Sequence, residues 1–198
     1  MFLRTITGGL AFTSACCIAG AKTTIAASSG HRRLDVFRSE VLRRALVGKT
    51  MAQVRTATEH VFSRLHWISR TTEALIQHRN EGRHILVATG SLSVYVPALL
   101  EMKGICIDGL LATEIGVDGD VLTGEMITAS CTGVEKARRV REWLAGIGGP
   151  VWGYGNLPHD AAMLALTDYP TVIPILRQRP RHAAWRWLGY KRLTNFYV

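Results

Sequence analysis

The sequence predicts an α/β protein with a doubly wound, mostly parallel sheet and a helical segment in front of it. Three observations support this class. Apolar runs of strand length alternate with helical patterns between residues 71 and 173, a helical region without proline precedes them, and polar residues stand where several strands end. Open α/β sheets bind ligands at the carboxyl ends of their strands, so we expect the functional site there.

Composition describes an ordinary globular protein with a basic surface. The 198 residues suffice for one substantial core, 47% of them are hydrophobic and 20% charged, and the formal net charge is +9. This charge suits an anionic partner, although much of it is arginine scattered over helical patterns, where a solvated surface is the simpler interpretation. The four cysteines show no C-x-x-C pair, which favours a reduced, cytoplasmic compartment.

The N-terminus allows two interpretations. Residues 8–19 are weakly apolar, follow Arg4 and end in small residues, as a secretory signal does. Thr13 and Ser14 interrupt the apolar core, and a membrane span needs about 20 strongly apolar residues. We therefore expect no spanning helix and keep secretion or membrane association as the alternative to a cytoplasmic protein.

The helical and strand patterns follow one another in a regular order. From residue 34 to residue 77 apolar residues recur at helical spacing, and a break at Gly48 makes Thr50 the N-cap of the next helix. A β-hairpin is predicted over residues 113–124, with Asp118-Gly119 as its turn. The remaining predicted elements are helices at 71–80, 94–103, 134–145 and 159–166 and strands at 85–88, 109–112, 151–154 and 171–173.

Polar side chains stand at three strand ends or helix starts. Thr89 and Gly90 follow the first predicted strand and offer a hydroxyl and backbone N–H groups. Lys136 opens a helix and offers a positive charge, while Asn156 and Asp160 offer hard oxygen ligands for Mg²⁺. Phosphoryl transfer depends on such positioning and charge stabilisation. Singly, each signal is more often a turn, a solvated lysine or a helix cap, so their order carries the prediction.

The chain resembles the haloacid dehalogenase superfamily, in its phosphoserine-phosphatase-like branch with a helical cap. The resemblance is carried by residues 88–96, Gly124, 131–136 and 154–164, and it covers roughly residues 34–175. It implies a Rossmann-like sheet and a Mg²⁺-dependent phosphomonoester phosphatase that works through an aspartyl-phosphate intermediate. It also implies a small phosphorylated metabolite as partner, with no nucleic acid expected.

The resemblance assigns roles to the polar residues. Thr89 would bind a phosphoryl oxygen together with the Gly90 amide, and Lys136 would stabilise the nucleophile and the phosphorylated intermediate. Asn156 and Asp160 would be the Mg²⁺-binding pair. The family more commonly has an aspartate where Asn156 stands, and a neutral ligand should weaken Mg²⁺ binding.

The family's nucleophile motif, D-x-D-x-T/V at the end of the first strand, has no match before Thr89. Asp118 and Asp120 follow the second motif and lie in the hairpin turn, while the earlier carboxylates sit on helical patterns: Asp35, Glu40 and Glu59. In this fold the first strand lies in the middle of the sheet. We therefore expect a sheet without its first, central strand, in which neighbouring strands lose a partner and unpaired backbone groups cost about 1–3 kcal/mol each.

Residues 1–4 resemble the stretch that follows the first motif in this branch. The expectation is that the sequence begins just downstream of the nucleophile, through a misassigned start or a real truncation, and that the 198 residues alone have little or no activity. One alternative is a non-catalytic member that binds a phosphorylated ligand through Thr89, Lys136 and Asp160. Another is a secreted or membrane-associated member anchored by the apolar N-terminus and the Trp-rich tail.

Two domains are expected, an apolar N-terminus with a cap-like helical segment (1–82) and an α/β core (83–198). The basic, aromatic tail of the core, residues 177–198, is interpreted as a packed terminal helix. The alternative is contact with an anionic membrane surface through this tail or through the N-terminus.

Overall fold

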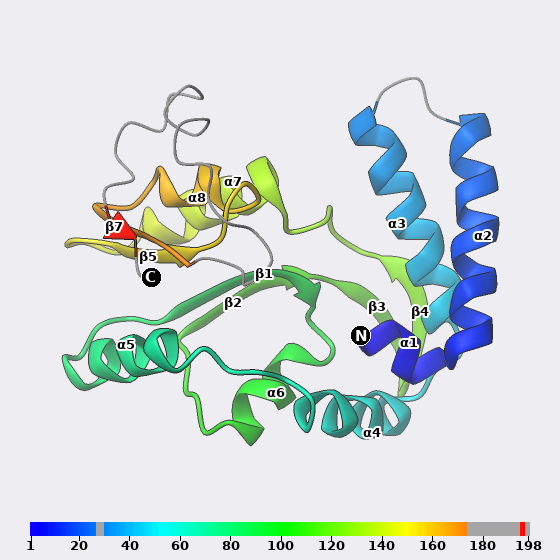
Figure 1. The fold of residues 1–198 in the computed structure, drawn as a ribbon, viewed down its shortest axis with the longest axis horizontal. Coiled ribbons are helices and arrows are strands. Elements are labelled where there is room, and N and C mark those ends of the chain that lie inside the picture. The colour runs from blue at the N-terminus through cyan, green and yellow to red at the C-terminus, as the bar shows by residue number, and fades with distance from the viewer. Residues whose placement is uncertain (27–29, 174–194, 197–198) are drawn as a thin grey trace. The chain divides into compact units, whose positions relative to one another are not determined.

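The computed structural model describes residues 1–26, 30–173 and 195–196 (Figure 1). The chain forms two compact units, Met1–Leu86 with Ser91–Ser130 and Val87–Gly90 with Cys131–Val198. The tail predicted over residues 177–198 lies outside the described residues, except for Asn195–Phe196.

The first unit is mainly helical and carries a small hairpin. Strand β1 (Leu86–Leu92) is shared by the two units and pairs with β2 (Gly109–Thr113), and β3 (Ile115–Asp118) pairs antiparallel with β4 (Val121–Met126). The helices of the first unit are α1 (Phe2–Thr7), α2 (Gly9–Ala26), α3 (Gly30–Leu46), α4 (Met51–Phe62), α5 (Ser69–Asn80) and α6 (Val96–Met102). Within the described residues, none of the helices has both the length and the apolar character needed to cross a bilayer.

The second unit alternates strands and helices as the sequence predicts. Its elements are α7 (Gly133–Leu144), β5 (Trp152–Gly155), α8 (Ala161–Leu164), β6 (Tyr169–Val172) and β7 (Asn195–Phe196). Strand β6 pairs in parallel with β5 on one side and β7 on the other. The prediction of an α/β fold with parallel strands is confirmed.

In the described chain, β1 pairs with β2 and β5 pairs with β6. The expectation that neighbouring strands lose a partner stays a prediction. Strand β1 also runs four residues beyond its predicted end at residue 88, so that Thr89 and Gly90 lie inside the strand instead of following it. The sequence 89–91 contains no proline to stop a strand, and pairing with β2 carries the extended backbone onward.

Helix α4 begins as the sequence predicts. The Thr50 hydroxyl accepts the amide of Gln53 at 3.2 Å, and the Gln53 side chain accepts the Thr50 amide at 3.1 Å. This reciprocal capping box satisfies two N–H groups that the first turn would otherwise leave unpaired. The predicted N-cap at Thr50 is confirmed.

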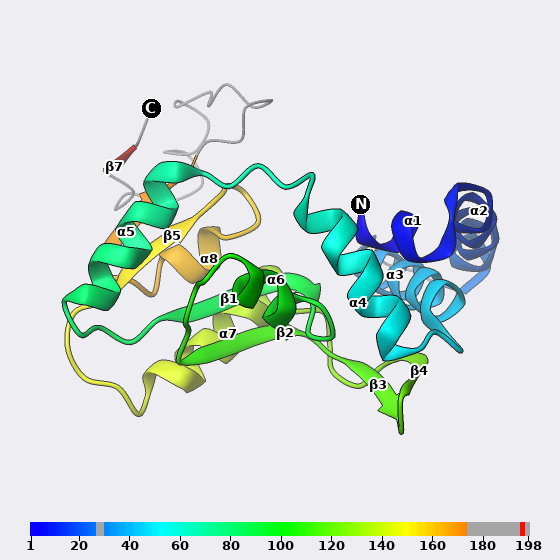
Figure 2. The ribbon, with the colours of Figure 1, turned by 90° about the horizontal axis from the view of Figure 1, so that it is seen from below.

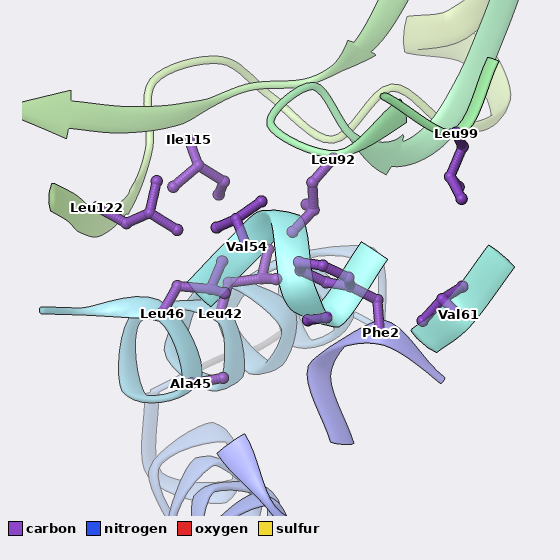
Figure 3. Packing of buried hydrophobic residues seen from close by; sticks show 11 residues of the cluster. Phe2, Leu42, Ala45, Leu46, Val54, Val61, Leu92, Leu99, Ile115 and Leu122 are labelled. Atoms are coloured by element: carbon purple, nitrogen blue, oxygen red, sulfur yellow. The ribbon is translucent and has the colours of Figure 1, made fainter. Parts of the chain in front are cut away.

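One apolar cluster joins the helices of the first unit to its hairpin (Figure 3). Leu46 and Leu122 are almost fully buried and come from α3 and β4, and Phe2 of α1 stacks on Tyr95 with 4.1 Å between ring centroids. The labelled side chains in Figure 3 point toward one another from α1, α3 and α4 on one side and from the hairpin, β1 and α6 on the other. The N-terminal helix α1 is therefore part of the packed core.

Backbone hydrogen bonds fix the turn between α3 and α4 to the hairpin, which Figure 2 shows beside these helices. Gly48 donates to the Leu122 carbonyl at 3.0 Å, Leu122 donates to Lys49 at 2.8 Å, and Met51 donates to Asp120 at 2.9 Å. The hairpin turn is Gly119-Asp120, because Asp118 pairs with Val121. The predicted turn at Asp118-Gly119 was therefore wrong by one residue, since cross-strand pairing and not composition sets the register.

In each of the strand pairs β1–β2 and β5–β6, the aspartate just before the second strand is hydrogen-bonded to the residue just before the first strand. Asp108 accepts the Ile85 amide at 2.7 Å, and its own amide donates to the Ile85 carbonyl at 2.8 Å. Asp168 and Val151 repeat this exchange in the second unit, at 2.8 and 2.9 Å. Each aspartate side chain thereby supplies an additional hydrogen bond where its strand pair begins.

Replacing Asp108 with asparagine should destabilise the protein in a pH-dependent manner. The Arg79 guanidinium and the Ile85 amide hold the pKa of Asp108 below its ordinary value, so the charged form stabilises the fold above the unfolded pKa of about 4. That contribution is lost as pH falls through the lower folded pKa. Urea unfolding should show D108N less stable than the native chain at pH 7, with the difference shrinking below about pH 4.

The matched control is Asp118→Asn, which changes an exposed aspartate of the hairpin. It should leave the midpoint of unfolding nearly unchanged. An equal, pH-independent loss in both variants would contradict the role given to Asp108.

Candidate functional site

The loop between β5 and α8 folds back on itself through Asp160. The Asp160 Oδ2 accepts the Asn156 amide at 2.9 Å, and the Asp160 amide donates to the Asn156 carbonyl at the same distance. Asp160 occupies the N-cap position of α8, yet its side chain caps none of the helix amides. The carboxylate is instead turned toward the strand end and toward α7. The peptide bond between Leu157 and Pro158 in this loop is cis.

Gly155 leaves the room that Asp160 occupies. A Cβ atom at Gly155 would lie 2.7 Å from the Asp160 Cβ and 3.0 Å from its Oδ2. These separations are shorter than nonbonded contacts allow, so a side chain at Gly155 would displace the carboxylate. The last residue of β5 therefore sets where Asp160 lies.

Lys136 and Asp160 form a buried ion pair. The Lys136 Nζ lies 2.5 Å from the Asp160 Oδ1, and the two residues are 7% and 8% exposed. Lys136 belongs to the face of α7 that also buries Ala137 and Val140, which explains why a charged side chain is directed into the unit. With Oδ2 held by the Asn156 amide, both carboxylate oxygens accept a hydrogen bond.

Cys131 hydrogen-bonds to strand β1 and lies within the electrostatic influence of Lys136. Its side chain is fully buried, and this burial raises the pKa of its thiol. The positive charges of Arg139 and Lys136 lower that pKa in part, as does a hydrogen bond from the Thr89 backbone. The Thr89 backbone thus contacts Cys131, and Lys136 acts on the Cys131 thiol through its charge. The part played by Cys131 and Arg139 was missed from the sequence, because helical spacing identifies neighbours on α7 but not what faces them.

Charged side chains also surround the first turn of α7. Glu135 accepts hydrogen bonds from Arg138 at 2.8 Å and from Arg139 at 2.7 Å, and these lower the pKa of its carboxyl to about 2. Such pairs three and four residues apart are visible in the sequence. A carboxylate in the first turn also complements the positive end of the helix dipole.

The oxygens of Asn156 and Asp160 are of the type that Mg²⁺ prefers, but they form an incomplete donor set. No cluster of three or more His, Cys, Asp or Glu side chains suited to a metal ion occurs in the described residues. The single carboxylate is paired with the Lys136 ammonium. The chemistry of the ligands suits a hard cation, and their present arrangement suits an ammonium ion.

The structure brings together part of the predicted site. Asp160 contacts both Lys136 and the Asn156 amide. The Thr89 backbone hydrogen-bonds to Cys131, and the charge of Lys136 acts on the Cys131 thiol. Gly90 lies next to Thr89 on β1.

The carboxylates that were excluded as nucleophiles lie on other elements than the Lys136 site. Glu40 pairs with Arg43 and Arg44 on α3, and Glu59 pairs with Arg55 on α4. Asp35 is exposed on α3, and Asp118 and Asp120 lie at the hairpin turn of the first unit. Within the described contacts, Asp160 is the carboxylate paired with Lys136.

The haloacid dehalogenase-like hydrolase family matches residues 2–165. The chain belongs to this family. A comparison with curated proteins found no match.

Solved structures of low sequence identity share the fold. A haloacid dehalogenase family hydrolase from Salmonella enterica serovar Typhi superposes with a TM-score of 0.67 at 10% identity, covering 100% of this chain and 62% of that one. A probable phosphoserine phosphatase from Vibrio cholerae gives 0.65 at 13%, covering 86% and 50%. A phosphoserine phosphatase described as a phospho-aspartyl intermediate analogue gives 0.52 at 18%, covering 85% and 78%. The chain thus spans between half and two thirds of the first two of these proteins.

Proposed function

We propose that this chain is a phosphomonoester phosphatase of the haloacid dehalogenase type, similar to phosphoserine phosphatases, and that it binds a small phosphorylated metabolite. Thr89, Gly90 and Lys136 would bind the phosphoryl group. The observation that carries the proposal is the buried ammonium of Lys136, held by Asp160. A positive charge in a water-poor site stabilises phosphoryl oxygens far better than one at the surface.

Mg²⁺ is the cofactor that we propose, with Asn156 and Asp160 as its protein ligands. Its binding should be weak for two reasons. Asn156 contributes no negative charge, and the Asp160 Oδ1 is held by Lys136 at 2.5 Å. When bound, the ion would supply positive charge for the phosphoryl oxygens.

We expect little or no turnover from these 198 residues alone. An aspartyl-phosphate mechanism needs a carboxylate as nucleophile, and the D-x-D-x-T/V motif that supplies it in the family has no match before Thr89. The same observation favours a second candidate function, a non-catalytic protein that binds a phosphorylated ligand.

The organisation of the protein follows the same proposal. Residues 1–82 would form the apolar N-terminus and cap-like segment, and residues 83–198 the α/β core with its tail. We propose a cytoplasmic location and no nucleic-acid partner. Contact with a membrane surface through the N-terminus or the tail is the alternative.

Binding of inorganic phosphate tests the proposed site. We expect calorimetry to detect phosphate binding, and Thr89→Val to weaken it roughly 10- to 100-fold, because a hydrogen bond to a charged group contributes about 1.5–3 kcal/mol. Thr123→Val is the matched control, since the Thr123 hydroxyl donates to Gly116 in the hairpin of the other unit. It should bind phosphate as the native chain does.

Hydrolysis of p-nitrophenyl phosphate with Mg²⁺ then separates the two candidate functions. Turnover that disappears in Thr89→Val would establish hydrolysis by these residues. Phosphate binding without turnover supports the expectation of little or no turnover, and it is consistent with the non-catalytic candidate. Absence of phosphate binding, or equal binding by Thr89→Val, would refute the proposed site.

A further inference from the structure

A groove of about 1070 Å³ lies along α1 and α4, wholly within the first unit. One wall is formed by α1 and the start of α2, the other by α4 and the turn after it. Core packing fixes the position of the first wall, because Phe2 of α1 is 5% exposed and stacks on Tyr95. The size is that of a pocket for a small organic molecule.

Basic side chains line this groove without an acidic counterpart. Arg4 comes from α1, His60 from α4 and Arg64 from the turn that follows, and no Asp or Glu is among the lining residues. No ion pair joins any of these three to a carboxylate within the part of the chain that the structure describes. The nearest acid on α4, Glu59, is instead paired with Arg55. The electrostatic potential of the groove therefore favours an anion.

The other polar side chains of the groove are already used within their own helices. Thr5 and Thr56 donate their hydroxyl hydrogens to backbone carbonyls at 3.3 and 3.2 Å, and the Gln53 carbonyl accepts the Thr50 amide in the capping box. The N–H groups of Arg4, His60 and Arg64 are the main donors left to bind a ligand. Donors in excess again match a ligand rich in acceptor oxygens.

The lining also has an apolar part. Ile6 of α1 and Ala52 and Ala57 of α4 contribute side chains that make no hydrogen bonds, and Ala57 is 4% exposed. Most small-molecule sites combine such a surface with a few polar groups that fix orientation. An inorganic ion alone would leave this surface uncovered.

We propose that the groove between α1 and α4 binds a small organic anion with an apolar body, whose acidic group pairs with Arg4 and Arg64. Arginine suits this role because its planar guanidinium binds carboxylate and phosphate groups through two parallel hydrogen bonds. The groove shares no residue with the phosphate site proposed at Lys136, since all of its lining residues belong to the first unit.

Calorimetry with naphthaleneacetate tests the proposal on the full chain. We expect binding that weakens at least tenfold in the Arg4→Gln, Arg64→Gln double variant, and binding of the neutral naphthaleneacetamide to be weaker by a similar factor. Arg55→Gln is the matched control, because Arg55 is exposed on α4 and does not line the groove. Its affinity for the probe should equal that of the native chain.

Two comparisons can overturn the proposal. Equal affinities for the acid and its amide would show an apolar site without anion recognition, and an undiminished affinity in the double variant would place the probe elsewhere. Thr89→Val separates the two sites. Loss of probe binding in that variant would assign the probe to the proposed phosphate site. If the native chain binds the probe but not phosphate, only the phosphate site is refuted.

Discussion

Replacing Lys136 with methionine should lower the free energy of unfolding by about 3–5 kcal/mol at neutral pH. Methionine fills much of the same volume but leaves the Asp160 carboxylate buried, 8% exposed, without its counterion. An uncompensated buried charge costs far more than the intact pair contributes. Urea unfolding followed by circular dichroism gives the measurement.

Arg141→Met is the matched control on the same helix, since Arg141 is exposed on α7. It should cost less than about 1 kcal/mol, through the weaker complement to the helix dipole. Adding Asp160→Asn to Lys136→Met should restore much of the lost stability, because the buried charge is then gone. A loss under about 1 kcal/mol in Lys136→Met would show that the pair is open to solvent in solution.

Replacing Gly124 with alanine should cost about 2–5 kcal/mol. Its φ of 78° adds about 1–2 kcal/mol for a residue with a Cβ, and steric overlap adds about 1–3 kcal/mol. The new Cβ would lie 2.6 Å from the Arg43 carbonyl oxygen and 2.9 Å from the Val47 amide nitrogen, both in the backbone of the α3 end. Thermal and urea unfolding should both show the loss.

Gly48→Ala isolates the steric part of this effect. Gly48 has a similar φ of 73°, yet a Cβ there would meet nothing within 4 Å. Its cost should be about 1–2 kcal/mol, from backbone strain alone. Equal losses at the two positions would contradict the close approach of α3 and β4.

Local signals in the sequence predicted most elements of the fold. The cap at Thr50 and the helices α5, α6 and α7 follow from residues only a few positions apart, and all were found near their predicted ends. Helix α8 is shorter than predicted, four residues in place of 159–166. The amphipathic pattern indicated a helix there. After Leu164 the amides of Leu166 and Thr167 bond to carbonyls three residues back, which is a turn and not a further turn of α-helix.

Contacts between distant segments explain what the sequence left open. The sequence allowed Asp160 to be predicted as a helix cap or a metal ligand, and it identified Lys136 by its order along the chain. The ion pair between the two depends on how α7 packs against α8, which the sequence does not show. Gly124 was noted within the family pattern, while its reason, the backbone of α3, lies far away in sequence. Tertiary contacts of this kind leave no local pattern.

The hydrogen bonds between the α3–α4 turn and the hairpin have a consequence for the way the chain opens. The amides of Gly48, Met51 and Leu122 donate across segments that lie far apart in the sequence. Their exchange with deuterated solvent requires the helices and the hairpin to separate in the same event. These amides should therefore show one common free energy of opening after correction for their intrinsic exchange rates. They would mark a single cooperative block that closes late in folding because its contacts span long loops.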